Sequence, residues 1–106
     1  QSPKRVVQNF IHAANIDGKL LGDDRVINLP GLTVTVKDMI NSLERITSPE
    51  VTKLISHEPD AFLQSIVLTW PPHFDPKNAV RLGFVSDASS EEIIRTFIAE
   101  EGIAIK

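Results

Sequence analysis

The stretch from Trp70 to Phe84 reads W-P-P-H-F-D-P-K-N-A-V-R-L-G-F and contains a complete short helix with a signal at each end. We expect Asp75 to cap this helix with Pro76 in its first position, because proline lacks an amide hydrogen that would have no partner there. Gly83 is expected to end the helix in the left-handed conformation, which a Cβ opposes. The Pro71–Pro72 pair forbids a preceding helix from continuing. The stretch therefore predicts short, well-delimited helices joined by tight turns.

Similar helix signals occur on both sides of this stretch. Ser2 caps an expected helix from about Pro3 to Ile16, and Thr35 caps another that has the spacing of a capping box. Ser89 and Glu92 form the clearest capping box in the sequence and lead into the last helix. Apolar residues recur every three or four positions within these stretches, which is the period of a helix with one buried face. Two further helix starts are expected at Ser48–Pro49 and Pro59–Asp60.

Two short strands are expected between the first and second of these helices. Arg25 to Leu29 reads R-V-I-N-L, a run that favours β-structure and that Pro30 and Gly31 end. From Leu32 to Val36 apolar residues alternate with threonine, which is typical of a half-buried strand, although this run overlaps the next expected helix start. We therefore predict a mainly helical α+β domain with about five helices and a small sheet of two or three short strands.

Length and composition exclude several classes of protein. With 106 residues the chain suits one domain, here residues 1–106, with a single core. No apolar run approaches the roughly 20 residues that cross a bilayer, so no membrane span is expected. The chain has no cysteine, which excludes disulfides and thiolate metal sites, and we expect a cytoplasmic location. A net charge of −3 provides no positive surface for phosphate backbones, so nucleic acid is not an expected partner.

The sequence also lacks the residues of common catalytic and cofactor sites. It contains no tyrosine, and its five glycines never fall at the close spacing of a dinucleotide-binding loop. His12, His57 and His73 lie too far apart in the sequence to form a local metal motif. We therefore predict no catalytic, cofactor-binding or metal-ligating residue in this chain.

A small-molecule pocket is the function that the Trp70–Phe84 stretch favours. Its caps and closing glycine serve the helix itself, but Trp70 and His73 flank a rigid Pro-Pro corner that can wall a pocket. Burial in the core at the end of an amphipathic helix is the alternative interpretation of Trp70. For His12 we expect a ring that is partly packed at the boundary of the first helix.

A second hypothesis is an acidic helical carrier or protein-interaction module that acts on its own. Asn41, Ser42 and Leu43 come close to the Asp-Ser-Leu motif of phosphopantetheine carrier proteins. In carriers the serine begins a helix, so that its phosphate lies at the positive end of the helix dipole. Ser42 lies in the middle of an expected helix and lacks the preceding aspartate, so an exposed helix serine is the simpler interpretation.

Several segments resemble one enzyme family over nearly the whole chain. R-V-I-N-L-P-G, from Arg25 to Gly31, is similar to a late strand that ends in Asn and a glycine turn, and Thr33 to Leu43 is similar to the helix after it. F-D-P-K-N-A-V-R-L-G, from Phe74 to Gly83, and the later S-S-E-E-I-I resemble the closing signature. The family is the extended short-chain dehydrogenases, or NAD-dependent epimerases/dehydratases, and the branch that the chain most resembles is that of the D-erythronate dehydrogenases.

The resemblance implies a substrate-binding C-terminal lobe of a larger Rossmann-type α/β enzyme, with the N-terminal NAD-binding domain absent. The parent enzyme would use NAD to oxidise a hydroxyl of a small sugar acid such as D-erythronate, and this chain alone would be inactive. Lys4 stands where the branch usually has an arginine, which implies a partner for the substrate carboxylate, with Trp70 as pocket wall and His73 as polar contact. An exposed first-turn lysine is the simpler interpretation of Lys4.

Departures from the family pattern narrow these expectations. The sugar-nucleotide epimerases have an Arg-Pro-Gly-Asp-like segment whose arginine contacts the diphosphate, but this chain has no arginine between Trp70 and Asp75. A small sugar-acid substrate is therefore favoured over a nucleotide sugar. The family's glycine-rich fingerprint and Tyr-x-x-x-Lys pair have no counterpart here. Without the cofactor domain, the strand from Arg25 to Leu29 would have an uncovered edge, which predicts self-association or strand exchange.

Overall fold

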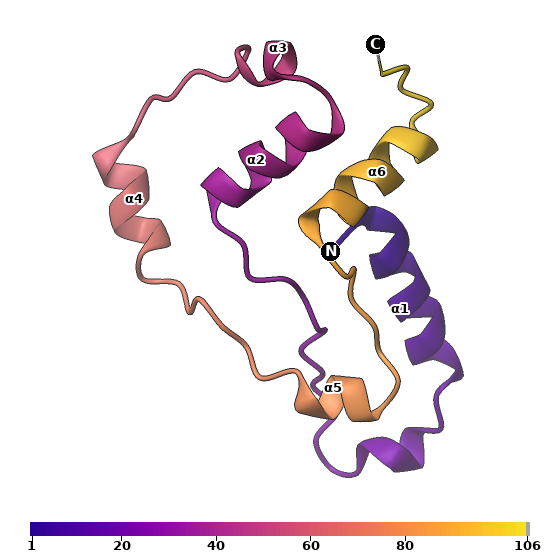
Figure 1. The fold of residues 1–106 in the computed structure, drawn as a ribbon. Coiled ribbons are helices and arrows are strands. Elements are labelled where there is room, and N and C mark those ends of the chain that lie inside the picture. Colours follow the sequence, from indigo (N-terminus) through magenta and orange to yellow (C-terminus); the bar gives the residue numbers. More distant parts are fainter. Residues whose placement is uncertain (106) are drawn as a thin grey trace.

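The computed structural model describes residues 1–105, which form an open frame of six α-helices and one 3₁₀-helix (Figure 1). Extended segments join most of these helices, and the frame is flat, with extents of 51 × 36 × 16 Å. The elements in chain order are α1 (Pro3–Asn15), η1 (Gly18–Leu21), α2 (Val36–Ile46), α3 (Pro49–Thr52), α4 (Ala61–Val67), α5 (Lys77–Arg81) and α6 (Ser90–Glu100).

The helix starts confirm most of the predicted caps. The hydroxyl of Ser2 accepts a hydrogen bond from the Arg5 amide at 3.3 Å and so caps α1. At α2 the capping box is complete: Thr35 Oγ1 accepts from the Asp38 amide, and the Asp38 carboxylate accepts from the Thr35 amide. Asp60 accepts from the amide of Leu63 at 3.0 Å at the start of α4. These contacts join residues three positions apart, so they need no tertiary structure.

Two predicted helix starts differ in detail. α5 begins at Lys77 with Pro76 as its N-cap residue, one position later than predicted. The carboxylate of Asp75 accepts a hydrogen bond from the Lys77 amide at 3.1 Å, which is the contact expected of a capping aspartate. At α6 the Ser89 hydroxyl accepts from the Glu92 amide as expected. The side chain of Glu92, however, accepts from the amide of Ala88 rather than from that of Ser89.

The predicted small sheet is wrong for the part of the chain that the structure describes. Residues 1–105 contain no strand, and both Arg25–Leu29 and most of Leu32–Val36 are extended but unassigned backbone, with α2 beginning at Val36. No backbone hydrogen bond joins residues 23–34 to another backbone segment of residues 1–105. A strand is stable only when a neighbouring strand satisfies its amides and carbonyls. Both segments are extended, but no neighbouring strand within residues 1–105 pairs with them.

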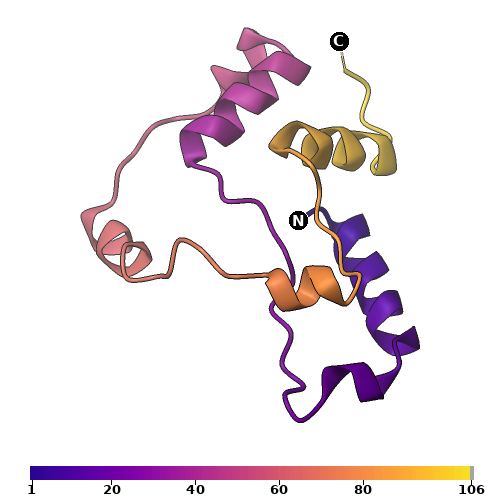
Figure 2. The same ribbon diagram turned by 60° about the horizontal axis from the view of Figure 1, so that its bottom comes forward.

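The core is small and lies around α5. Its buried apolar side chains are those of Ala79, Leu82 and Phe84. Partly buried side chains pack against them from the C-cap of α1, from η1 and from residues 24–35, which we call the extended segment. Farther along the chain, α2 packs on both α3 and α6. α4 stands apart from the other helices in both views of the ribbon (Figures 1 and 2). The frame thus has one packed end around α5 and another formed by α2, α3 and α6. The segment that carries α4 joins α3 to α5 along one side.

Candidate functional site

A hollow of about 540 Å³ lies where the start of α1, the extended segment and the Pro-Pro corner meet. We call it the corner hollow. Most of its lining residues are apolar, with the polar residues Gln1 and Thr33 among them, which is the usual composition of a small-molecule site. The residues that line it are Gln1, Val6, Leu29, Pro30, Gly31, Leu32, Thr33, Val34, Pro72, Phe74 and Pro76.

His73 lies at the edge of the corner hollow, between two of its lining residues. Its ring nitrogen Nδ1 is 3.3 Å from the hydroxyl of Thr33, which itself lines the hollow. This contact joins the corner to the extended segment across 40 positions of the sequence. Sequence reasoning did not single out Thr33, because nothing near it in the sequence indicates its distant partner.

Lys4 lines a second, smaller hollow of about 220 Å³, which we call the polar hollow. Its Nζ is 3.6 Å from Oε1 of Glu100 on α6, and both side chains are exposed. Arg5 lines the same hollow and lies 3.6 Å from Glu92, while its buried Nε has no hydrogen-bond partner within residues 1–105. Sequence reasoning missed Arg5, although it follows Lys4 directly. The two cations face two carboxylates, from Glu92 and Asp87, so the charges in the hollow nearly balance.

Asp87 is the buried acid of the polar hollow. Its carboxylate is 2% exposed and accepts two hydrogen bonds from Ser2, at 2.7 Å from the amide and at 2.6 Å from the hydroxyl. Burial raises the pKa of Asp87, but the hydrogen bonds from the hydroxyl and amide of Ser2 outweigh it, so the pKa lies below its ordinary value. Asp87 is therefore charged at neutral pH and holds the N-cap of α1 in place.

The three predicted substrate-binding residues lie in three places. His73 flanks the corner hollow and Lys4 lines the polar hollow, on different sides of the start of α1. Trp70 belongs to the turn after α4, is 63% exposed and lines neither hollow. In residues 1–105 alone, these side chains do not converge on one cavity.

The geometry of Ser42 argues against the carrier hypothesis. Ser42 lies inside α2, as expected, but it is 1% exposed rather than on the surface. Its hydroxyl is 2.6 Å from the hydroxyl of Ser90 and also accepts a hydrogen bond from Arg45 at 3.2 Å. A transferase that attaches a pantetheine arm needs an accessible hydroxyl, whereas this one links α2 to α6.

His12 is partly packed, as the sequence predicts. Its Nε2 donates to the carbonyl of Leu82 at 2.7 Å, and its ring meets the edge of Phe84 with centroids 4.8 Å apart. Gly83 lies directly below the ring with φ of 88°, and a Cβ there would come within 3.1 Å of Nε2. The histidine therefore has a structural role that ties α1 to the end of α5.

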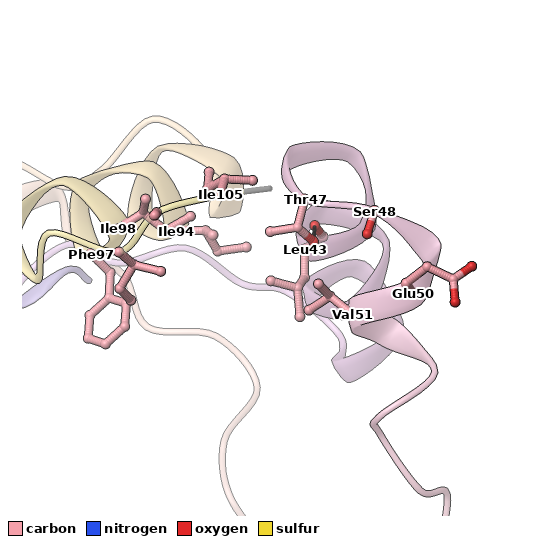
Figure 3. A pocket seen from close by; sticks show the side chains of 11 residues that line it. Leu43, Thr47, Ser48, Glu50, Val51, Ile94, Phe97, Ile98 and Ile105 are labelled. Atoms are coloured by element: carbon pink, nitrogen blue, oxygen red, sulfur yellow. Dashed lines mark hydrogen bonds between the residues drawn. The ribbon is translucent and has the colours of Figure 1, made fainter.

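An apolar groove of about 620 Å³ is lined by residues of α2 and α3 on one side and of α6 and the segment after it on the other. Figure 3 shows Leu43 and Val51 on one side of the groove and Ile94, Phe97 and Ile98 on the other. It contains few polar groups that could orient a reactive ligand. Within residues 1–105 no group of three or more His, Asp or Glu side chains is placed to hold a metal ion. None of the helices in this part of the chain has the length and apolar character needed to cross a membrane.

Comparison with known proteins gives a consistent result. The chain is 39% identical over 103 residues to a D-erythronate dehydrogenase from Cupriavidus necator, covering 97% of this chain and 32% of that protein. It is 38% identical over 97 residues to a D-erythronate dehydrogenase from Haemophilus influenzae, covering 92% of this chain and 31% of that protein. No protein-family model matches the chain.

A solved structure matches the same region. The crystal structure of the nucleoside-diphosphate-sugar epimerase from Agrobacterium tumefaciens superposes with a TM-score of 0.92 and 36% identity, over 99% of this chain and 31% of that chain. The chain is thus homologous to a part of these proteins and spans about a third of their length.

Proposed function

We propose, from this homology to one third of the D-erythronate dehydrogenases, that the chain is the substrate-binding C-terminal lobe of an NAD-dependent dehydrogenase that oxidises a hydroxyl of a small sugar acid such as D-erythronate. The observation that carries the proposal is the 39% identity over 97% of the chain. The matched region is nearly the whole chain, so it includes most of the residues that line the two hollows.

The residues that the chain contains decide which steps of the proposed reaction it can perform. Oxidation of a hydroxyl needs a hydride acceptor and a base for the hydroxyl proton. The chain contains no tyrosine, the family's acid/base residue, and no glycine-rich loop to hold a dinucleotide. In this proposal NAD and the base belong to an NAD-binding domain outside the chain, and this lobe supplies binding and orientation of the substrate.

The ion pair between Lys4 and Glu100 is weak enough for a substrate carboxylate to take the place of Glu100. An exposed ion pair such as Lys4 with Glu100, at 3.6 Å, contributes about 0–1 kcal/mol. A carboxylate that approaches in a desolvated site gains more than this, so it displaces Glu100. Arg5 lines the same hollow as Lys4 and is the second cation available to the same carboxylate. His73, beside Thr33 at the corner hollow, is the proposed polar contact for a substrate bound in that hollow instead, because Lys4 and His73 do not share a cavity.

A chimeric enzyme tests the proposal. The part of the Cupriavidus necator enzyme that matches this chain is replaced by the chain, and reduction of NAD is followed with D-erythronate and, separately, with a nucleotide sugar. We expect turnover of the sugar acid only. A folded chimera that ignores sugar acids, or that prefers the nucleotide sugar, would contradict the proposed substrate class.

Single variants of the chimera test the proposed binding residues. Lys4→Gln and His73→Gln should each raise KM for the sugar acid by about tenfold with a smaller change in kcat, because each removes a binding contact worth about 1.4 kcal/mol. Trp70→Ala should raise KM as well if the indole walls the completed site. Lys53→Gln is the matched control, since Lys53 is also an exposed lysine, paired with Glu50 at 2.8 Å. Equal effects at Lys4 and Lys53 would remove Lys4 from the site.

A further inference from the structure

One face of α1 is attached to the chain between α5 and α6. The attachments run from Ser2 to Asp87, from Asn9 to Val85 and from His12 to Leu82. Positions 2, 9 and 12 lie on one face of the helix, because residues three, four or seven apart are neighbours on a helix surface. The chain between α5 and α6 runs beside α1 in the opposite direction, as both views of the ribbon show (Figures 1 and 2). The attachments therefore hold α1 at three points along its length.

Asn9 forms the central attachment with a buried side chain that is 1% exposed. Its Nδ2 donates to the carbonyl of Val85 at 2.8 Å, and its Oδ1 accepts from the amide of Val85 at 3.1 Å. The side chain thus satisfies both backbone groups of Val85, as a neighbouring strand would. Burial of an amide costs free energy unless its donor and its acceptor are both paired, and here both are. The contact therefore fixes Asn9 on this one residue.

Asp87 lines the polar hollow together with Lys4 and Arg5, but within residues 1–105 it forms no ion pair with either cation. Its Oδ2 accepts from the amide of Ser2 and its Oδ1 from the hydroxyl, so Ser2 uses both carboxylate oxygens. Lys4 and Arg5 are paired instead with carboxylates of α6, at 3.6 Å in both cases. The buried acid therefore anchors α1 and leaves the two cations to other partners.

Lys4 and Arg5 lie between two of the attachments. Ser2 and Asn9 are about 10 Å apart along the helix axis, because each residue of an α-helix rises about 1.5 Å. A single attachment would let the helix pivot, whereas two attachments fix both the position and the direction of its first two turns. The position of the two cations in the polar hollow is therefore set by the attachments on either side of them.

We propose that Asn9 and Asp87 are positioning residues for the substrate carboxylate, because they fix the part of α1 that places Lys4 and Arg5 in the polar hollow. This inference rests on the proposed function and adds to it two residues that act through the helix rather than by contact with the substrate. A displacement of about 1 Å in a group that orients the substrate can reduce the rate by about a hundredfold, so an anchor of this kind has a measurable effect.

Replacement of Asp87 distinguishes positioning from simple electrostatics. Asp87→Ala removes a negative charge from a hollow that holds the substrate carboxylate, so charge alone predicts tighter binding and a lower KM. Loss of the attachment at Ser2 displaces the cations and predicts a higher KM. The two effects have opposite signs, so the direction of the change identifies the cause.

The test measures KM and kcat of the chimeric dehydrogenase for the sugar acid. We expect Asp87→Ala and Asn9→Ala each to raise KM by about tenfold, with kcat changed by less than about twofold. Asp87→Asn removes the same charge but keeps an oxygen and an NH₂ group that can bond to Ser2, so its KM should stay within about threefold of the wild-type value. Asn15→Ala is the matched control, because the hydrogen bond of Asn15, to the Ile11 carbonyl at 2.8 Å, stays within α1.

A double-mutant cycle with Lys4→Gln shows whether Asn9 acts through the cation. Asn9→Ala should raise KM by a smaller factor in the Lys4→Gln background than in the wild type, because one of the groups that Asn9 positions is already gone. Partial unfolding of a variant lowers the fraction of active enzyme and so lowers the apparent kcat, but it leaves KM unchanged. The cycle and the KM values therefore separate positioning from a general loss of stability.

Each outcome decides the inference. A higher KM in both alanine variants, with Asp87→Asn and Asn15→Ala near the wild type, supports it. An unchanged or lower KM in Asp87→Ala, or the same change in Asp87→Ala and Asp87→Asn, overturns it, as does an Asn9→Ala effect of equal size in both backgrounds. If Lys4→Gln itself leaves KM unchanged, the proposed carboxylate site is wrong and the inference falls with it. If Lys4→Gln raises KM but neither alanine variant does, only the inference is refuted.

Discussion

Replacing Gly83 with alanine should destabilise the fold by about 1.5–3.5 kcal/mol. Gly83 has φ of 88°, a left-handed conformation that costs an L-residue about 1–2 kcal/mol. The new Cβ would also lie 3.1 Å from Nε2 and 3.2 Å from Cε1 of His12. The ring must then shift away from the Leu82 carbonyl, which it now meets at 2.7 Å, and the loss of that hydrogen bond adds about 0.5–1.5 kcal/mol.

A double-mutant cycle separates the two contributions. In the His12→Ala background there is no ring to displace, so Gly83→Ala should cost only the conformational part, about 1–2 kcal/mol. Urea unfolding followed by circular dichroism measures the free energy of unfolding of all four proteins. If Gly83→Ala costs less than about 0.5 kcal/mol, or the same amount in both backgrounds, the proposed contact between the glycine and the histidine is wrong.

Three further outcomes follow from the contacts described above. Asp87→Ala should lower the free energy of unfolding by about 2–3 kcal/mol, measured by urea unfolding, since it leaves the amide and hydroxyl of Ser2 without their buried charged partner. Because the pKa of Asp87 is lower in the folded protein than in the unfolded one, the stabilisation by Asp87 is complete above the unfolded-state pKa and is lost as the pH falls through the folded-state pKa. If Asp87→Ala loses stability below about pH 4 to the same extent as the wild type, this reasoning is wrong. Incubation with a phosphopantetheine transferase should leave the mass of the chain unchanged, because Ser42 is buried; an adduct at Ser42 would revive the carrier hypothesis. The isolated chain should self-associate in sedimentation experiments, and a well-behaved monomer at high concentration would show that its uncovered apolar faces and its unpaired 25–29 segment are tolerated in water.

The sequence predicts well those features whose causes lie within a few residues. The Ser2 cap, the Thr35–Asp38 capping box and the left-handed Gly83 all depend on neighbours in the chain, and all are present. A strand at Arg25–Leu29 depends on a partner that no local pattern supplies, and the segment remains unpaired.

The candidate site shows the same limit more strongly. The Pro71–Pro72 corner marks His73 in the sequence. Its contact with Thr33 joins residues 40 positions apart, which no local pattern indicates. Likewise the local sequence around Ser42 predicts an exposed helix serine, but the hydroxyl of Ser90, 48 positions away, contacts it in the fold. Whether Lys4, Trp70 and His73 share one substrate depends on surfaces that residues 1–105 do not complete, so their joint role stays a prediction.

The hydrogen bonds between Ser2 and Asp87 also determine when the N-terminus of α1 can reach its native contacts during synthesis on the ribosome. The two residues are separated by 85 positions, and Asn9 similarly waits for the backbone of Val85. At an elongation rate of about 5–20 residues per second, α1 emerges about 4–17 s before its anchor. During that interval the N-cap residue Ser2 lacks its buried charged partner, and only the arrival of Asp87 completes the hydrogen bonds that hold the start of α1.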